Sequence, residues 1–355
     1  MRTATALTAL AAALLLLTGC GGPPAQPGAD PGAEPGASGD PVATAPTPLL
    51  DLDCAGLADR AVLDAAFSPA TVQQQLAFEG SGGYYPLSQH GLAQAGALRC
   101  EFSDLGAEGP ERYALLSVLP DAEAPWQRLL PEIALFQPQT PGYGDDARQD
   151  CFSGDYVSCR IDVLVGDRWL SAVLGGLTSA DAAGPLIESV VAAIAAAAPI
   201  AAAWSADSTA PASCDALLTA ADVEAALGVA LQPWERAAPT QPVLYHAGFE
   251  AAGGLFCSWR NDFSAASAMT AEAAVLPGGA WAWAEYWAIT PSDRVDREQV
   301  PGLGDEAWAG CTGDVVCWVS VRVGEDWLDV SVNDESVPDE REAAIELARL
   351  IVPNL

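Results

Sequence analysis

The chain contains no lysine, since all 15 of its basic residues are arginines, and it has only two histidines among 355 residues. Without lysine there is no P-loop lysine, no Schiff-base lysine and no Ser–Lys pair. Neither a GxSxG nor an HExxH motif occurs, so the usual signatures of α/β-hydrolases and zinc peptidases are missing too. An acid-residue hydrolase is left open, because a catalytic carboxylate pair has no sequence signature.

Positive charge is scarce beside negative charge. The 47 acidic residues give the chain a formal net charge of −32. Such a surface repels nucleic acid and anionic lipid headgroups, and favours solubility, cations or basic partners. We therefore expect no nucleic-acid partner. The missing lysine itself is explained by a GC-rich codon supply, because alanine, glycine, proline and arginine are all heavily used.

The first 19 residues have the order of a signal peptide. Arg2 is positive, residues 9–17 form an apolar core too short for a durable membrane span, and Leu17-Thr18-Gly19-Cys20 places small residues before a cysteine. This order resembles a bacterial lipoprotein signal peptide. The resemblance implies cleavage before Cys20, acylation of its thiol and anchoring to the outer face of the cell membrane. The alternative is an ordinary secretory signal with an incidental cysteine.

The rest of the chain divides into a tether and two domains. Residues 20–48 are almost entirely Gly, Pro, Ala, Ser and Thr with scattered acids, which predicts a disordered tether. The remaining length suits two domains of about 150 residues each. We place the first at 49–198, a linker at 199–213 and the second at 214–355.

These two domains are predicted to be copies of one module. Eight cysteines fall into two sets of four with nearly the same spacing: Cys54, Cys100, Cys151 and Cys159, then Cys214, Cys257, Cys311 and Cys317. Residues 142–147 also parallel 302–307, and residues 165–170 parallel 323–328. The chain is therefore a tandem duplication.

The cysteines are expected to form disulfides within each repeat. An exported chain meets an oxidising compartment, which favours disulfides. The alternative is that the cysteines bind zinc, but the sequence has no CxxC spacing to support it. Requiring one pattern in both repeats leaves three of the 105 possible pairings. Cys151 with Cys159 and Cys311 with Cys317 would each close a hairpin loop. This predicts that the long-range bonds are Cys54–Cys100 and Cys214–Cys257.

Periodicity predicts an α+β fold. Short helices are expected after the first cysteine of each repeat, with strands near 98–103, 112–119, 254–260 and 270–276 and middle helices around 122–136 and 279–289. Alternating runs at 161–165 and 319–323 turn at a Gly–acid pair into a second strand, as hairpins do. Closing helices are predicted near Pro185 and Pro338. We expect two tandem homologous modules, each an antiparallel sheet covered by helices and braced by two disulfides.

Three short motifs of the second repeat carry a family resemblance. They are Cys214-Asp215-Ala216-Leu217-Leu218 at a helix start, Cys257-Ser258-Trp259 in a strand, and Gly302–Ala307 before a hairpin and an Ala-rich last helix. Together they resemble actinobacterial surface lipoproteins of unassigned function and, more remotely, the extracellular sensor domain of mycobacterial-type receptor serine/threonine kinases. The first repeat departs at its helix start and has Phe102 in place of the tryptophan. The resemblance implies a non-catalytic envelope domain and transfers no functional residue.

The titratable residues offer few candidate sites. His90 and His246 lie in Gly-rich segments that are expected to be loops. Each histidine would be either a pH-sensitive or metal-binding group, or a loop residue that forms hydrogen bonds with the backbone. The adjacent carboxylates at 145–146 and 305–306 would suit Ca²⁺, or would satisfy backbone donors before a strand. We favour the structural alternative in both cases. No metal, cofactor or catalytic residue is predicted.

Aromatic residues supply the candidate ligand contacts. Eleven tryptophans are present, and Trp281, Trp283 and Trp287 crowd one predicted helix. Buried, they would cover the sheet; exposed, they would stack on sugars or anchor a partner. Trp169 and Trp327 have the opposite phase from the apolar face of their strands. They would pack under a second helix layer, which a helix near 185–198 could provide, or face solvent.

The expected function is that of a membrane-anchored extracytoplasmic lipoprotein with two binding or sensor-like modules for an envelope ligand or protein partner. The expected contacts are the membrane, through the N-terminal lipid anchor, and a ligand bound in a cleft between the repeats or on a Trp-lined face. One alternative is an acid-residue hydrolase acting on cell-envelope glycans. The other is a purely structural envelope protein.

Overall fold

A computed structural model describes most of the chain beyond residue 44. The described residues are 45–66, 71–74, 84–104, 112–129, 140–154, 156–201, 204–234, 243–261, 270–289, 296–312, 316–333, 337 and 339–355. They belong to one compact unit that runs from Val42 to Leu355. The predicted signal peptide, Cys20 and most of the predicted tether lie outside the described residues.

The first repeat is built on an antiparallel six-stranded sheet with the order β1-β2-β3-β6-β5-β4. Its strands are β1 (Thr71–Gln74), β2 (Leu98–Ser103), β3 (Tyr113–Leu119), β4 (Asp146–Ser153), β5 (Val157–Val165) and β6 (Arg168–Leu177). The predicted hairpin is β5–β6. It turns at Gly166, whose φ of 63° lies in the left-handed region that favours glycine.

The second repeat reproduces this sheet and extends it. Its order is β10-β11-β12-β13-β9-β8-β7, all antiparallel, so β10 is an additional edge strand. The strands are β7 (Gln232–Pro233), β8 (Leu255–Arg260), β9 (Thr270–Leu276), β10 (Asp296–Gln299), β11 (Glu306–Thr312), β12 (Val316–Val323) and β13 (Asp326–Asn333). The fold is therefore α+β with two tandem modules, as predicted.

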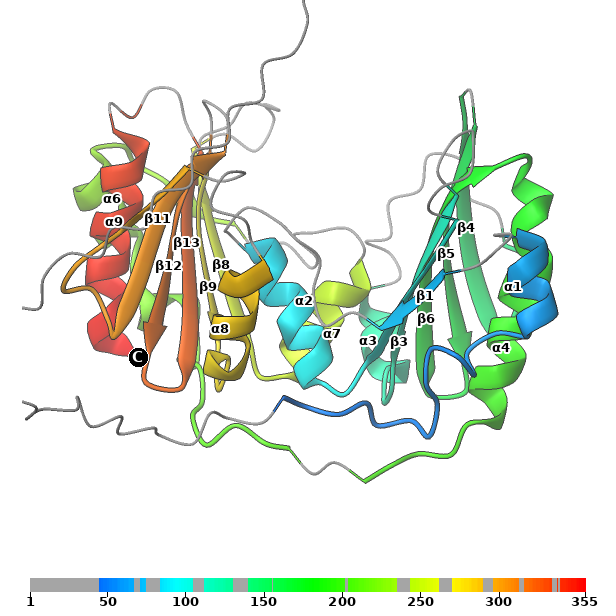
Figure 1. Cartoon of the computed structure of the whole chain (residues 1–355). Helices are drawn as coiled ribbons and strands as arrows, with labels where there is room; N and C mark the ends of the chain where they lie inside the picture. Colours follow the sequence, from blue (N-terminus) through cyan, green and yellow to red (C-terminus); the bar gives the residue numbers. More distant parts are fainter. Residues whose placement is uncertain are drawn as a thin grey trace, which may run out of the picture. The chain divides into compact units, whose positions relative to one another are not determined.

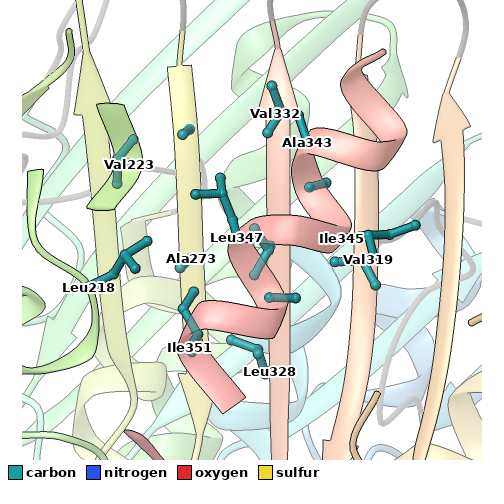
Figure 2. Close-up of a cluster of buried hydrophobic side chains, with 14 of the residues drawn as sticks. Leu218, Val223, Ala273, Val319, Leu328, Val332, Ala343, Ile345, Leu347 and Ile351 are labelled. Atoms are coloured by element: carbon teal, nitrogen blue, oxygen red, sulfur yellow. The ribbon is translucent and has the colours of Figure 1, made fainter. Parts of the chain in front are cut away.

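Each sheet has an outer face covered by helices of its own repeat (Figure 1). These helices are α1 (Arg60–Ala66), the short η2 (Ala180–Ala183) and α4 (Gly184–Ala196) in the first repeat, and α5 (Cys214–Leu217), α6 (Ala220–Leu227), α9 (Glu340–Ile351) and η3 (Val352–Asn354) in the second. Figure 2 shows α9 lying across the second sheet, with Leu347 and Ile351 beside Ala273 and Leu328. Burying these apolar side chains is the main stabilising contribution on this face.

Helix α6 begins with a capping box. The Thr219 hydroxyl accepts from the Asp222 amide, and the Asp222 carboxylate accepts from the Thr219 amide. The Thr219 hydroxyl, followed by the Thr219 amide, donates to the Asp222 carboxylate and so lowers the pKa of Asp222. Within the part of the chain described, no helix is long and apolar enough to cross a membrane.

Four disulfides brace the two outer cores, and they join the cysteine pairs that the spacing predicts. Cys54–Cys100 and Cys214–Cys257 tie each N-terminal helical segment to the sheet. The other two bonds join directly paired residues of adjacent strands, Cys151–Cys159 and Cys311–Cys317. In the loop-entropy account the long bonds stabilise by about 4 kcal/mol each and the short ones by about 2.6 kcal/mol. Such bonds indicate a protein that folds in an oxidising compartment outside the cytoplasm.

The inner face of each sheet is covered by a helix from the other repeat. Helix α2 (Tyr84–Gln94) of the first repeat packs on β9 and β13 of the second, and α7 (Val243–Ala251) of the second packs on β3 and on α3 (Glu123–Leu129) of the first. One shared core contains Leu87, Ala93, Phe249, Leu276 and Trp327, and the other contains Leu92, Leu119, Trp169, Leu244 and Ala247. The two repeats therefore exchange helices.

Helices α2 and α7 pack against each other at two equivalent glycines. Gly91 and Gly248 each precede the second cysteine of their repeat by nine residues, 100 − 91 and 257 − 248. A Cβ atom on Gly91 would lie 2.8 Å from the Phe249 Cα, and one on Gly248 would lie 2.7 Å from the Leu92 Cα. Because both neighbours are backbone atoms, only glycine permits this approach.

Neither exchanged helix was expected from the sequence, which predicts loops around His90 and His246. Both segments contain glycine, and α2 also contains Pro86, so their intrinsic helix propensity is low. Burial on the opposite sheet overrides that propensity. The expected cover for Trp169 was also wrong, because α4 lies on the outer face while Trp169 packs with residues of α3 and α7.

We predict that Gly91→Ala destabilises the protein. In an open helix this change stabilises by up to about 1 kcal/mol. Here the added methyl group meets the Phe249 backbone, and overpacking of this kind costs about 1–3 kcal/mol. Urea unfolding gives the free energy change, and Gly142→Ala serves as the control because a Cβ there meets nothing within 4 Å. A stabilised Gly91→Ala variant would contradict the close helix crossing.

Candidate functional site

The three candidate ligand-contact tryptophans lie in the inner core of the second repeat. Trp281 and Trp283 on α8 (Ala280–Ile289) are each 4 % exposed, and Trp287 is half-buried. The Trp281 indole donates to Gln94 Oε1 of α2 at 3.1 Å. Trp287 stacks on Trp318, with ring centroids 5.8 Å apart. The structure thus selects core packing for Trp281 and Trp283, since no ligand reaches either without opening the core.

His90 is a core residue of α2 and not a loop residue. Its ring lies 5.6 Å from Trp281, 6.0 Å from Tyr286 and 5.2 Å from Trp327, measured between centroids. Among the described residues neither ring nitrogen has a hydrogen-bond partner. Complete burial, followed by the charge of Arg99, lowers the pKa of His90 to about 3. The imidazole is therefore neutral near pH 7.

His246 has a different environment, in α7. Its Nε2 lies 3.3 Å from Glu250 Oε1, and Glu250 also pairs with Arg128 of α3, across the two repeats. Burial raises the pKa of Glu250, but bonding and charge from His246 and Arg128 outweigh it, so that the pKa is lowered. With Gly91 and Gly248 aligned, His246 corresponds to Gln89. The two histidines are therefore not equivalent positions.

The paired carboxylates at 145–146 and 305–306 hold turns together. Asp145 Oδ2 accepts the Gly166 amide, and Asp305 Oδ2 accepts the Gly324 amide, both at 2.6 Å. This is the backbone-satisfying role that the sequence favours. No group of three or more potential metal ligands occurs in the described ranges.

A small pocket of about 290 Å³ lies beside the end of α2, and its lining includes Gln94, Asp121 and Trp204. Gln94 is already engaged, because its amide nitrogen donates to the Pro277 carbonyl at 2.7 Å and its oxygen accepts from Trp281. Asp121 has a φ of 51°, where the equivalent residue of the second repeat is Gly278 with a φ of 65°. The described lining residues offer one carboxylate, Asp121, and one hydroxyl, Thr47, but no second charged group, and they do not argue for a ligand.

A larger pocket of about 460 Å³ lies on the outer side of the first repeat, between α1, the end of β6, η2 and the start of α4. Helix α1 contributes small side chains, Ala61, Val62, Ala65 and Ala66. The rest of the apolar wall comes mainly from Leu177, Pro185 and Leu186. Small-molecule sites are typically concave, mostly apolar and about 300–1,000 Å³ in volume. Its volume and its apolar wall make this pocket a candidate ligand site.

Arg112, at the start of β3, is the one charged residue among the described lining residues of this pocket. Its Nε donates to Asp104 Oδ2 at 2.6 Å, and its backbone amide donates to Asp104 Oδ1 at 2.9 Å. The Asp104 side chain is 1 % exposed, whereas that of Arg112 is 34 % exposed. Asp104 thus fixes the guanidinium by one edge. The terminal nitrogens have no bonding partner among the described residues.

The second repeat shares only part of this pocket's lining, because three alanines of α1 are alanines in both repeats while other lining residues differ. Aligned through the first cysteine of each repeat, Val62 corresponds to Asp222; aligned through the final helices, Pro185 corresponds to Glu342. The Asp104–Arg112 pair corresponds to Asn261 and Met269. The pocket is therefore a feature of the first repeat. The sequence indicates this pocket only through the residues that differ between the aligned repeats. A search for motifs that both repeats share does not find such differences.

Comparisons with known proteins add little. No family model matches the chain, and no curated protein matches it. A solved structure described as the di-domain ARO/CYC StfQ from the steffimycin biosynthetic pathway is 9 % identical, with a TM-score of 0.17 over 86 % of this chain and 96 % of that one. A TM-score this low supports no conclusion about either fold or function.

We predict that His90 makes the fold acid-sensitive. Its folded-state pKa lies below the unfolded value of about 6.5, so the unfolded chain binds the extra proton. The contribution is fully present above pH 6.5 and is lost as the pH falls toward 3. Between pH 7 and pH 5 the wild type should lose about 2 kcal/mol more than His90→Leu does. Urea unfolding at both pH values measures this; parallel losses in the two proteins would contradict it.

Proposed function

We propose that this protein is a lipid-anchored, extracytoplasmic binding protein and that the first repeat holds its ligand site. The observation that carries the proposal is the apolar pocket bounded by α1, the end of β6 and α4. Its ligand is a small apolar or amphiphilic molecule of the cell envelope. The second repeat serves as a scaffold, because Trp281, Trp283, Tyr286 and Trp327 are packed inside its core.

The scaffold role follows from the helix exchange. Helix α7 of the second repeat covers the inner face of the first sheet, and Arg128 of α3 pairs with Glu250 of α7. The first sheet is therefore supported from behind while its outer face carries the pocket. A site on a supported sheet keeps its geometry better than a site on a free loop.

The anchor is supported by the order of residues around Cys20 and by the oxidised cysteines. An extended tether of residues 20–48 would reach up to about 80 Å at roughly 3 Å per residue, and glycine flexibility shortens it. A binding module held in this way samples the space next to the membrane. Envelope amphiphiles are concentrated there.

We expect the chain with Cys20→Ser, which removes the acylated thiol, to bind one equivalent of the neutral apolar dye N-phenyl-1-naphthylamine. Binding should raise the dye's fluorescence. The double variant Val62→Asp/Pro185→Glu places carboxylates against the pocket, as in the second repeat, and should weaken binding at least tenfold.

Ala192→Glu is the matched control for this experiment, because it adds a carboxylate at an exposed position of α4 outside the pocket lining. Its affinity for the dye should equal that of the parent chain. Absence of dye binding, or equal binding by the double variant, would contradict a ligand site in the first repeat.

The anchor has its own test. When the full chain is expressed in an actinobacterial host, the mature protein should begin at Cys20 and carry acyl chains, and should fractionate with membranes. Intact-mass measurement of the purified protein checks both the start and the added mass. A mature chain that begins elsewhere with an unmodified mass would show an ordinary secretory signal instead.

A further inference from the structure

Resting on the proposed function, we infer that the first-repeat pocket takes a single-chain amphiphile with a carboxylate head, and that Arg112 holds the head. The apolar wall of α1, Leu177 and Leu186 accommodates the hydrocarbon chain. Arg112 is the one charged residue among the described residues of this wall. These residues thus join an apolar surface to one cation, which is the pattern that a fatty carboxylate matches.

The guanidinium is prepared to receive a second carboxylate. Arginine has five N–H donors in a planar fork, and two edges of the fork can each donate to a carboxylate. Asp104 takes the Nε edge and, bonded to the Arg112 backbone amide as well, keeps the group from rotating. The terminal nitrogens are therefore held in a fixed direction. A positioned donor loses less conformational entropy when it binds than a free arginine does.

Charge selects a monoanion. The Asp104–Arg112 pair is neutral as a unit, in a chain with a net charge of −32. A doubly charged phosphate head would meet stronger repulsion from the acidic surface than a carboxylate head does. A carboxylate carries one charge and has the planar shape that the guanidinium edge fits. A cationic head would meet the guanidinium as a like charge.

The second repeat shows that the arrangement is not a requirement of the fold. Asn261 and Met269 occupy the positions of the ion pair, and Asp222 and Glu342 occupy those of Val62 and Pro185. The cation and two residues of the apolar wall, Val62 and Pro185, are thus replaced together in the sequence of the second repeat. This joint difference links Arg112 to the pocket and not to the stability of the module.

The test compares three probes with the same twelve-carbon chain: dodecanoate, 1-dodecanol and dodecyltrimethylammonium. Each competes with N-phenyl-1-naphthylamine for the chain that carries Cys20→Ser. The ratio of dodecanoate to dodecanol affinity is then measured again in Asp104→Asn/Arg112→Met, which introduces the residues of the second repeat and leaves no buried carboxylate unpaired. Loss of a charge-assisted pair should lower this ratio at least tenfold.

The outcomes separate this inference from the proposed function. An unchanged ratio, or the tightest binding by the cationic probe, would overturn the role of Arg112 while leaving an apolar site in place. Failure of all three probes to compete would overturn the ligand site itself. Thermal unfolding of the double variant, within a few degrees of the parent, confirms that it is folded; the dye affinity confirms that the pocket is intact.

Discussion

The structure depends on the close packing of α2 against α7. Gly91 and Gly248 bring the two backbones together, and each helix then reaches the inner face of the opposite sheet. If the helices stood further apart, both inner cores would lose part of their cover at once. The Arg128–Glu250 pair and the Trp281–Gln94 bond cross the same boundary. The two repeats therefore share their inner cores, although each keeps an outer core and two disulfides of its own.

The two repeats differ on the inner face in the placement of one buried carboxylate. In the first repeat Asp162 pairs across the sheet with Ser171 and accepts the Trp169 indole at 3.0 Å. In the second repeat the two residue types are exchanged between the strands: Ser320 on β12 lies opposite Asp329 on β13, which carries the carboxylate. The indole nitrogen of Trp327, which corresponds to Trp169, has no hydrogen-bond partner among the described residues. The same fold thus tolerates two arrangements of one buried carboxylate.

Much of this fold could be predicted from the sequence, and the rest could not for identifiable reasons. Cysteine spacing gives the duplication and the four bonds, and alternation gives the hairpins at Gly166 and Gly324, because both signals are local. Helix α2 was missed because its helicity comes from burial on strands β9 and β13, which lie more than 170 residues further along the chain. The pocket was missed because its apolar character shows only where Val62 and Pro185 are compared with their acidic counterparts.

The helix exchange also sets the order in which the exported chain can finish folding. Gln94 ends α2, and Trp327 on the strand it packs against follows 233 residues later, 327 − 94. The apolar side of α2 has no partner while the intervening chain is still crossing the membrane. Contacts this distant in sequence form slowly, and unpaired apolar surface promotes aggregation in the meantime. The proposed anchor at Cys20 would hold the chain at the membrane during this interval, so it would act on folding before any ligand binds.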